Sequence, residues 1–156
     1  MSLYPILLAL HSLTRWLVLL SLIYAIYRSY SGWRQDKPFS KFDNSVRHIT
    51  VTIAHIQLVL GVWLYFISPI TNYFLANFKT AVHERQIRFF GMEHVTVMLV
   101  AIVLITIGSA KAKRKPTDQL KYKTMAVWYT VAMVLIISSV PWQFSPLISR
   151  PYFRWF

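Results

Sequence analysis

Four long runs of apolar residues alternate along the chain with shorter polar segments that carry Lys and Arg. A helix that crosses a bilayer needs about 20 mainly apolar residues, and each run is long enough. The pattern predicts membrane-spanning helices over residues 4–28, 47–68, 87–110 and 123–143. We therefore expect an all-α fold, an up-down four-helix bundle in a membrane, with residues 1–156 forming a single domain.

Composition supports a membrane protein. Hydrophobic residues make up 56% of the chain and charged residues 14%, whereas soluble domains contain about 45–50% apolar and about 25% charged residues. There is no cysteine, which excludes disulfides, iron–sulfur clusters and thiolate-bound metals. The sequence also lacks the glycine-rich phosphate loops, the zinc-protease motif and the serine-hydrolase motif, so we expect no hydrolytic chemistry.

The net charge of +12 comes from 17 Lys and Arg against 5 acidic residues, and its distribution predicts the orientation. Basic residues concentrate in the first and third segments between spans: Arg28, Arg34, Lys37, Lys41, Arg47, Lys111, Lys113, Arg114, Lys115, Lys121 and Lys123. The opposite side carries fewer: Lys79, Arg85, Arg88, Arg150 and Arg154. The positive-inside rule then places both termini outside, on the periplasmic side of an inner (cytoplasmic) membrane. It explains the basic charge without a nucleic acid partner. The alternative for residues 111–115 (KAKRK) is a site for a polyanion or an anionic lipid.

Two segments outside the spans are aromatic. Residues 69–88 are moderately polar, and we expect a short helix on the outer surface there. The C-terminal stretch 145–156 places four aromatic residues beside two arginines, which is typical of an anchor at the headgroup belt.

Ionisable side chains at membrane depth are costly, so each is a functional candidate. The spans contain His11, Arg15, His55, Glu93 and His94. At a rise of about 1.5 Å per residue, the midpoints of the first three spans fall near Trp16, Gln57 and Leu99. His11 and His94 each lie five residues from their midpoint, about 7.5 Å toward the outer face. They should therefore be level with each other in the bundle.

Two level histidines on alternate helices can face each other across a bundle, the arrangement that holds a bis-histidine haem. A haem site needs two imidazoles, an apolar wall, small residues at close approaches and cations for the propionates. His11 and His94 are the candidate axial ligands, and Gly91 lies three residues from His94. Arg15, one turn from His11, could meet a propionate or Glu93. Arg88 is a second propionate candidate.

The same residues also fit a structural role, because membrane histidines often hydrogen-bond a neighbouring helix for about 0.6 kcal/mol. His55 lies about 3 Å to the cytoplasmic side of the midplane, and it could donate to a quinone oxygen or make a structural hydrogen bond. Glu93 is expected first as an ion-pair partner. His48 and His83 are expected at the surface.

Four stretches resemble a known family: HSLTRW, AHIQLVLGVWLYFISP, RFFGMEHVTVMLVAIVLITIG and SSVPW. They are similar to small bacterial four-helix membrane proteins of the cytochrome b-like kind, and more distantly to the haem b four-helix units of di-haem cytochromes b and haem A synthase. The resemblance implies His11 and His94 as haem ligands and His55 as a third site residue. A di-haem protein needs two level histidine pairs, and this chain has one.

Three functions remain open from the sequence. The first is a haem b electron carrier that exchanges electrons with a quinone. The second is a non-catalytic subunit of a larger membrane complex, in which the buried polar residues only hold the bundle together. The third is a metal-binding or transport protein that uses His11, His94 and Met92 or Met98, because imidazole and thioether suit copper. A homodimer or a larger complex is expected for so small a bundle.

Overall fold

The structure is a computed structural model that describes residues 3–142, and every regular element in this part of the chain is helical. The long helices are α1 (Leu3–Arg34), α2 (Lys41–Ile67), α6 (His94–Lys113) and α7 (Asp118–Ser139). Between α2 and α6 lie α3 (Pro69–Ala76), α4 (Phe78–Ala81), α5 (Arg85–Arg88) and a π-helical turn, η1 (Phe89–Glu93). Four segments are long and apolar enough to cross a membrane: Leu3–Arg34, Lys41–Ile67, Arg85–Lys113 and Asp118–Ser139. The prediction of an all-α protein with four such helices is confirmed.

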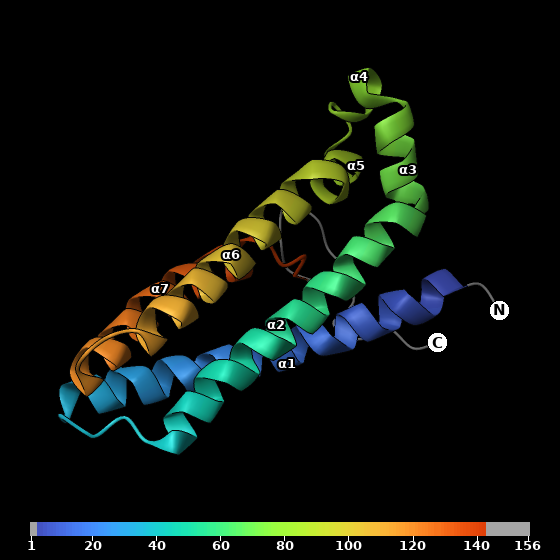
Figure 1. Ribbon diagram of the computed structural model, residues 1–156. Coiled ribbons are helices and arrows are strands. Elements are labelled where there is room, and N and C mark those ends of the chain that lie inside the picture. The colour runs from blue at the N-terminus through green and yellow to red at the C-terminus, as the bar shows by residue number, and fades with distance from the viewer. Residues whose placement is uncertain (1–2, 143–156) are drawn as a thin grey trace.

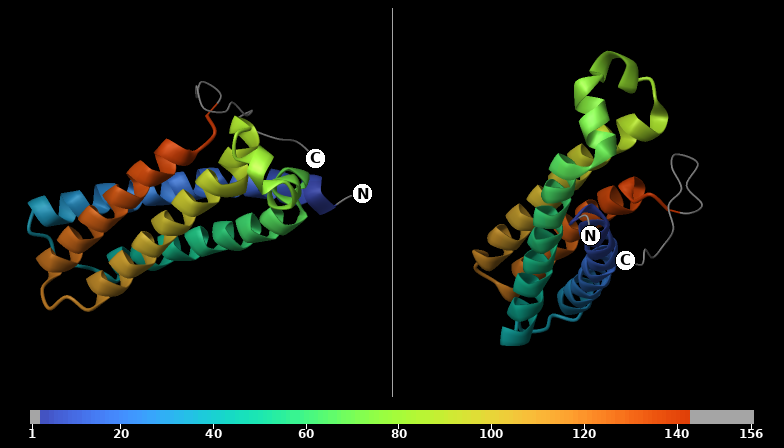
Figure 2. Two further views of the ribbon diagram at one scale, coloured as in Figure 1. Left: turned by 90° about the horizontal axis from the view of Figure 1, so that it is seen from above. Right: turned by 90° about the vertical axis from the view of Figure 1, so that its right-hand side faces the viewer.

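The four long helices run alternately up and down (Figure 1). α1 packs beside α2 and α7, and α6 packs beside α7 and α2, so that α1 and α6 are diagonal to each other. The connections after α1 and after α6 lie at one end of the molecule, which we call the basic end. The start of α1, the end of α7 and the segment α3–α5 lie at the opposite end (Figure 2).

The helices extend past the apolar runs that predicted them, because capping residues rather than apolar length set their bounds. α2 begins at Lys41 instead of residue 47, since Ser40 and Asp43 form a capping box that satisfies free backbone N–H groups. α7 begins at Asp118 instead of residue 123, since the Thr117 side chain accepts a hydrogen bond from the backbone N–H of Leu120.

Prolines set two helix boundaries at the opposite end. α2 stops at Ile67, and Pro69 then becomes the first residue of α3, a position that suits proline. α7 ends at Ser139 instead of residue 143, because Val140 precedes Pro141 and is extended. The expected short helix over residues 69–88 is present as α3, α4 and α5. The expected aromatic anchor, residues 145–156, lies outside the described residues.

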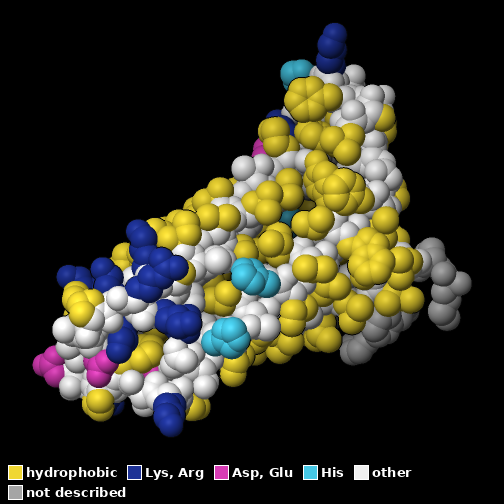
Figure 3. All heavy atoms as spheres, in the orientation of Figure 1, with side chains coloured by type: hydrophobic (Ala, Val, Ile, Leu, Met, Phe, Trp, Pro, Cys, Tyr) yellow, Lys and Arg dark blue, Asp and Glu magenta, His cyan; other side chains and the backbone are white. Residues whose placement is uncertain are grey.

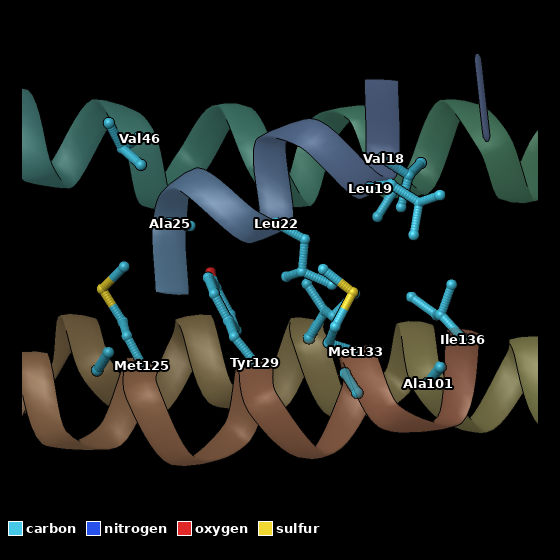
Figure 4. Packing of buried hydrophobic residues seen from close by; sticks show 14 of the residues in the cluster. Val18, Leu19, Leu22, Ala25, Val46, Ala101, Met125, Tyr129, Met133 and Ile136 are labelled. Atoms are coloured by element: carbon cyan, nitrogen blue, oxygen red, sulfur yellow. The ribbon is translucent and has the colours of Figure 1, made fainter. Parts of the chain in front are cut away.

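Most of the hydrophobic core lies in the half of the bundle nearer the basic end, and Ile136 and Val140 extend it into the other half. Figure 4 shows side chains of α1 meeting side chains of α7, with Leu22 and Tyr129 close to its centre. Small residues let the helices approach closely, among them Ala25, Ala101, Ala126 and Ala132, all fully buried. The other half of the bundle contains a cavity.

A buried carboxylate links α1, α2 and α7 at the basic end. Asp43 is 2% exposed, and its Oδ1 lies 2.6 Å from Nη2 of Arg28. Its Oδ2 accepts hydrogen bonds from the hydroxyls of Ser40 and Tyr122 at 2.6 and 2.7 Å. The Tyr122 ring lies so close to Gly32 that a Cβ there would be 2.4 Å from it. The acidic side chain thus has a partner on each of the two neighbouring helices, and this network holds the basic end together.

Candidate functional site

A cavity of about 240 Å³ lies in the half of the bundle away from the basic end. Side chains of all four long helices line it, mostly apolar, with a few polar groups between them. Figure 3 shows the face hollowed between α2–α3 and α5–α6, with histidine colour inside the hollow. The polar residues that line this cavity include His11, Ser12, Arg15, Gln57, Thr71 and His94. An apolar pocket with a few polar groups has the usual composition of a small-molecule site.

His94 has a defined tautomer. Its Nδ1 lies 2.8 Å from the backbone carbonyl oxygen of Ser139 on α7. A carbonyl only accepts, so Nδ1 must carry the proton, and neutral His94 has its lone pair on Nε2. The rings of Phe89 and Phe90 pack against the imidazole at 5.7 and 6.2 Å between centroids. The ring is therefore held in place with a nitrogen that can accept a proton, a hydrogen bond or a metal.

His11 enters the same cavity from α1, diagonally opposite α6, and contacts Gln57 on α2. Nε2 of Gln57 lies 3.0 Å from the His11 carbonyl oxygen and 3.3 Å from His11 Nε2. A carbonyl oxygen only accepts hydrogen bonds, so the nitrogen of the Gln57 amide must face His11. Gln57 therefore donates to the carbonyl oxygen and to Nε2 of His11. The Thr14 hydroxyl contacts the oxygen of the Gln57 amide. Neutral His11 then carries its proton on Nδ1.

Nδ1 of His11 is buried and has no hydrogen-bond partner among the described residues. A buried donor without a partner costs about 1–3 kcal/mol, and such groups are rare outside functional sites. A Cβ on Gly61 would lie 3.1 Å from Cε1 of this ring and 3.6 Å from Nδ1. Gly61 thus packs closely against the His11 ring, and a side chain at this position would press on an imidazole whose Nδ1 is already unsatisfied.

A π-helical turn leads directly into His94. η1 covers Phe89–Glu93, and π turns within helices often occur at functional sites. Within it, a Cβ on Gly91 would lie 2.3 Å from the Phe74 ring, and the Gly91 carbonyl accepts a hydrogen bond of 2.9 Å from the Tyr65 hydroxyl. Gly91 thus lets α3 pack against the turn that positions His94.

The two charged candidates lie in different surroundings. Arg15 lines the cavity, contacts the Ser12 hydroxyl at 3.5 Å and lies over the Trp16 ring at 5.4 Å. Glu93 is ion-paired, as expected first for this residue, and its partner is Arg88 at 2.6 Å. Arg88 also donates to the Val82 carbonyl at 3.0 Å. Arg15 therefore lines the cavity, and Arg88 forms an ion pair with Glu93.

The remaining histidines lie away from the lining of this cavity. Nε2 of His55 lies 2.9 Å from the Thr106 hydroxyl on α6. Thr106 gives its hydrogen to the Ile102 carbonyl at 2.8 Å, so His55 donates and links α2 to α6. His48 and His83 are exposed, as expected. Of the methionines considered for a metal site, Met98 lines the cavity, whereas Met92 is 41% exposed.

Sequence reasoning missed two partners of the site histidines. The contacts of Gln57 were not predicted, although an amide in the middle of an apolar span indicates a hydrogen bond between helices. Nothing in the sequence could indicate the Ser139 carbonyl as a partner of His94, because every residue has a backbone carbonyl oxygen. Among the described residues, no cluster of three or more His, Asp or Glu side chains could hold a metal ion.

By its helices the chain is a multi-pass α-helical membrane protein. It matches no protein-family model, no curated protein and no solved structure. Its function must therefore be argued from the cavity.

Proposed function

We propose that this protein binds haem b in the cavity between α1 and α6, with His11 and His94 as axial ligands, and that it transfers single electrons with a quinone as exchange partner. One observation carries the proposal. Two imidazoles from diagonal helices line one apolar cavity in the membrane-spanning part of the chain. That is the donor set that bis-histidine haem proteins use.

The cavity residues fit this group in their chemistry. A histidine that binds a metal usually donates its other ring N–H to a carbonyl or carboxylate, as Nδ1 of His94 does to Ser139. Gly61 is a small residue at the close approach of α2 to the His11 ring. Ligation through His11 Nε2 would replace its contact with Gln57, which at 3.3 Å is long for a hydrogen bond. Bound haem b would supply the one-electron chemistry.

Three features of the cavity then have a role in binding or tuning the group. The Ser139 carbonyl fixes the orientation of His94 and makes its Nε2 a more basic ligand for iron. Arg15 offers a positive charge to a propionate. The apolar lining excludes water and lowers the local dielectric, which tunes the reduction potential.

The orientation proposed for the protein follows from charge. Figure 3 shows Lys and Arg gathered at the basic end, over the end of α6 and the starts of α2 and α7, with apolar side chains covering the middle. The positive-inside rule supports a cytoplasmic-membrane protein with this end in the cytoplasm and both termini in the periplasm. The haem cavity would then lie in the outer half of the membrane.

The first experiment is a visible spectrum of the detergent-purified protein, air-oxidised and then reduced with dithionite, from cells supplied with a haem precursor. A sharp α-band in the reduced spectrum, with haem recovered by pyridine extraction, supports the proposal. A colourless protein without extractable haem contradicts it and favours the non-catalytic subunit.

A His and Met metal site is the second candidate, and one observation favours it. Met98 lines the same cavity as His11 and His94, and two imidazoles with a thioether suit copper. Metal analysis of the same preparation separates the two candidates. Stoichiometric copper without haem would replace the haem proposal by this one.

A further inference from the structure

We infer a second site, for the phosphate of an anionic phospholipid, in the groove between α2 and α6 at the basic end. It is independent of the haem proposal, because it uses none of the residues of that cavity. Its space of about 480 Å³ is lined by both helices, namely by Arg47, His48 and Val51 of α2, by Thr106, Ser109, Ala110 and Lys113 of α6, and by Arg114 just after α6.

The groove contains a buried cation with only neutral partners. Arg47 is 6% exposed. Its Nη1 donates to the hydroxyl of Ser109, and its Nη2 lies 2.9 Å from Oδ1 of Asn44. Both acceptors are uncharged. A buried charge is costly unless an opposite charge accompanies it, so an anion is expected beside Arg47.

No acidic side chain of the protein supplies that anion. The chain has only five acidic residues, and all of them are described. Three are in ion pairs with other cations, one accepts from a tyrosine and one is exposed: Asp43 with Arg28, Glu93 with Arg88, Asp118 with Lys121, Glu84 with Tyr73, and Asp36. Among residues 3–142, no carboxylate forms an ion pair with Arg47.

The other groups of the groove suit a phosphate. Lys113 and Arg114 add two exposed positive charges to that of Arg47. One guanidinium group can donate two parallel hydrogen bonds to two phosphate oxygens, and an ammonium group attracts the phosphate as a point charge. Basic pockets between membrane helices on the cytoplasmic side are where anionic lipid headgroups bind.

The surroundings favour a lipid over free phosphate. The groove lies between two helices that are long and apolar enough to cross a membrane. Farther along these helices, away from the basic end, aliphatic side chains are exposed, among them Ile56 and Val59 of α2 and Val103 of α6, at 50, 63 and 52%. A phosphate held at Arg47 would place its acyl chains along this apolar surface.

The test uses the full-length protein in detergent and two matched double variants. Lys113→Gln with Arg114→Gln removes two charges that line the groove, and Lys41→Gln with Lys115→Gln removes two exposed charges that do not line it. Thermal unfolding is followed during titration with dioleoylphosphatidylglycerol, dioleoylphosphatidylcholine or inorganic phosphate. Arg47→Gln is measured as a third variant, and the groove pair keeps the test decisive if that protein does not fold.

Phosphatidylglycerol should raise the unfolding midpoint of the wild type and of the Lys41 and Lys115 variant, with phosphatidylcholine giving a much smaller shift. The groove variant should bind phosphatidylglycerol about thirtyfold more weakly, since it loses two of the three Lys and Arg side chains that line the groove and would hold the phosphate, whereas Lys41 and Lys115 do not line it. Equal weakening in both double variants would overturn the site in favour of general surface charge. An equal shift with inorganic phosphate at the same concentration would overturn the lipid as the ligand.

Discussion

Nδ1 of His94 on α6 lies 2.8 Å from the backbone carbonyl oxygen of Ser139 on α7. This contact joins two neighbouring helices at the depth of the cavity and determines which ring nitrogen is protonated. Because Val140 is extended before Pro141, α7 ends at Ser139, and carbonyl groups in the last turn of a helix can accept from groups outside that helix. The end of one helix thus supplies the acceptor that orients the histidine of the next.

Replacing either cavity histidine should remove haem if the proposal is right. We expect His11→Ala and His94→Ala each to lower the haem content per protein at least about tenfold, because each removes an axial ligand. The measurement is the pyridine haemochrome spectrum at equal protein concentration. His83→Ala is the control, since His83 is exposed outside the cavity. Equal pigment in all three variants would contradict the ligand assignment.

Adding a side chain at Gly61 should have a similar effect without removing a ligand. A Cβ alone would lie 3.1 Å from the His11 ring, so Gly61→Leu must displace the imidazole or fill the space beside it. We expect haem content to fall at least about tenfold, as for loss of an orienting partner, while helix content by circular dichroism stays unchanged. Val59→Leu, at an exposed position of α2, is the matched control and should retain pigment.

The sequence predicted the four helices because apolar runs of bilayer length have one structural meaning. Their bounds were less accurate, since hydropathy does not register the capping side chains of Ser40 and Thr117. The buried network of Asp43 was not predicted either. It depends on Arg28 and Tyr122, which lie 15 and 79 residues away along the chain.

The candidate site shows the same division. Depth along straight helices was enough to bring His11 and His94 to a common level, and both line one cavity. The partner of Glu93 could not be found in that way, because residues 89–93 form a π turn. Residues five apart meet on a π turn, and the ion pair joins Arg88 and Glu93, five apart. On a regular α-helix the side chains that meet are three or four residues apart, so the sequence did not indicate this pair.

Removing the charge of Asp43 should destabilise the protein. Asp43→Asn leaves the partly exposed Arg28 without its counter-ion and weakens the capping of α2. We expect a loss of about 2–3 kcal/mol in unfolding free energy, because breaking a buried pair is costly. Unfolding in mixed micelles, followed by tryptophan fluorescence, measures it. Asp118→Asn removes a partly exposed pair with Lys121 and should change stability much less. An equal loss in both variants would contradict a special role for Asp43.

The contact between Gly91 and Phe74 predicts non-additive mutations. Gly91→Ala places a methyl group 2.3 Å from the Phe74 ring, and the resulting overpacking should cost about 1–3 kcal/mol. Phe74→Ala, at a residue 3% exposed, should cost about 3–5 kcal/mol through the space it leaves. In the double variant the new methyl group has room, so the two losses should sum to more than the measured loss. Strict additivity in a double-mutant cycle would show that the two residues are not in contact.

The charge distribution predicts which end faces the cytoplasm, and the absence of cysteine makes that easy to test. Single cysteines introduced as His83→Cys and Lys115→Cys lie at exposed positions at opposite ends of the molecule. In intact spheroplasts, a membrane-impermeant maleimide should label the cysteine at position 83. The cysteine at position 115 should react only after the membrane is permeabilised, since basic loops stay in the cytoplasm. Labelling of position 115 alone before permeabilisation would reverse the proposed orientation and move the haem cavity to the cytoplasmic half of the membrane.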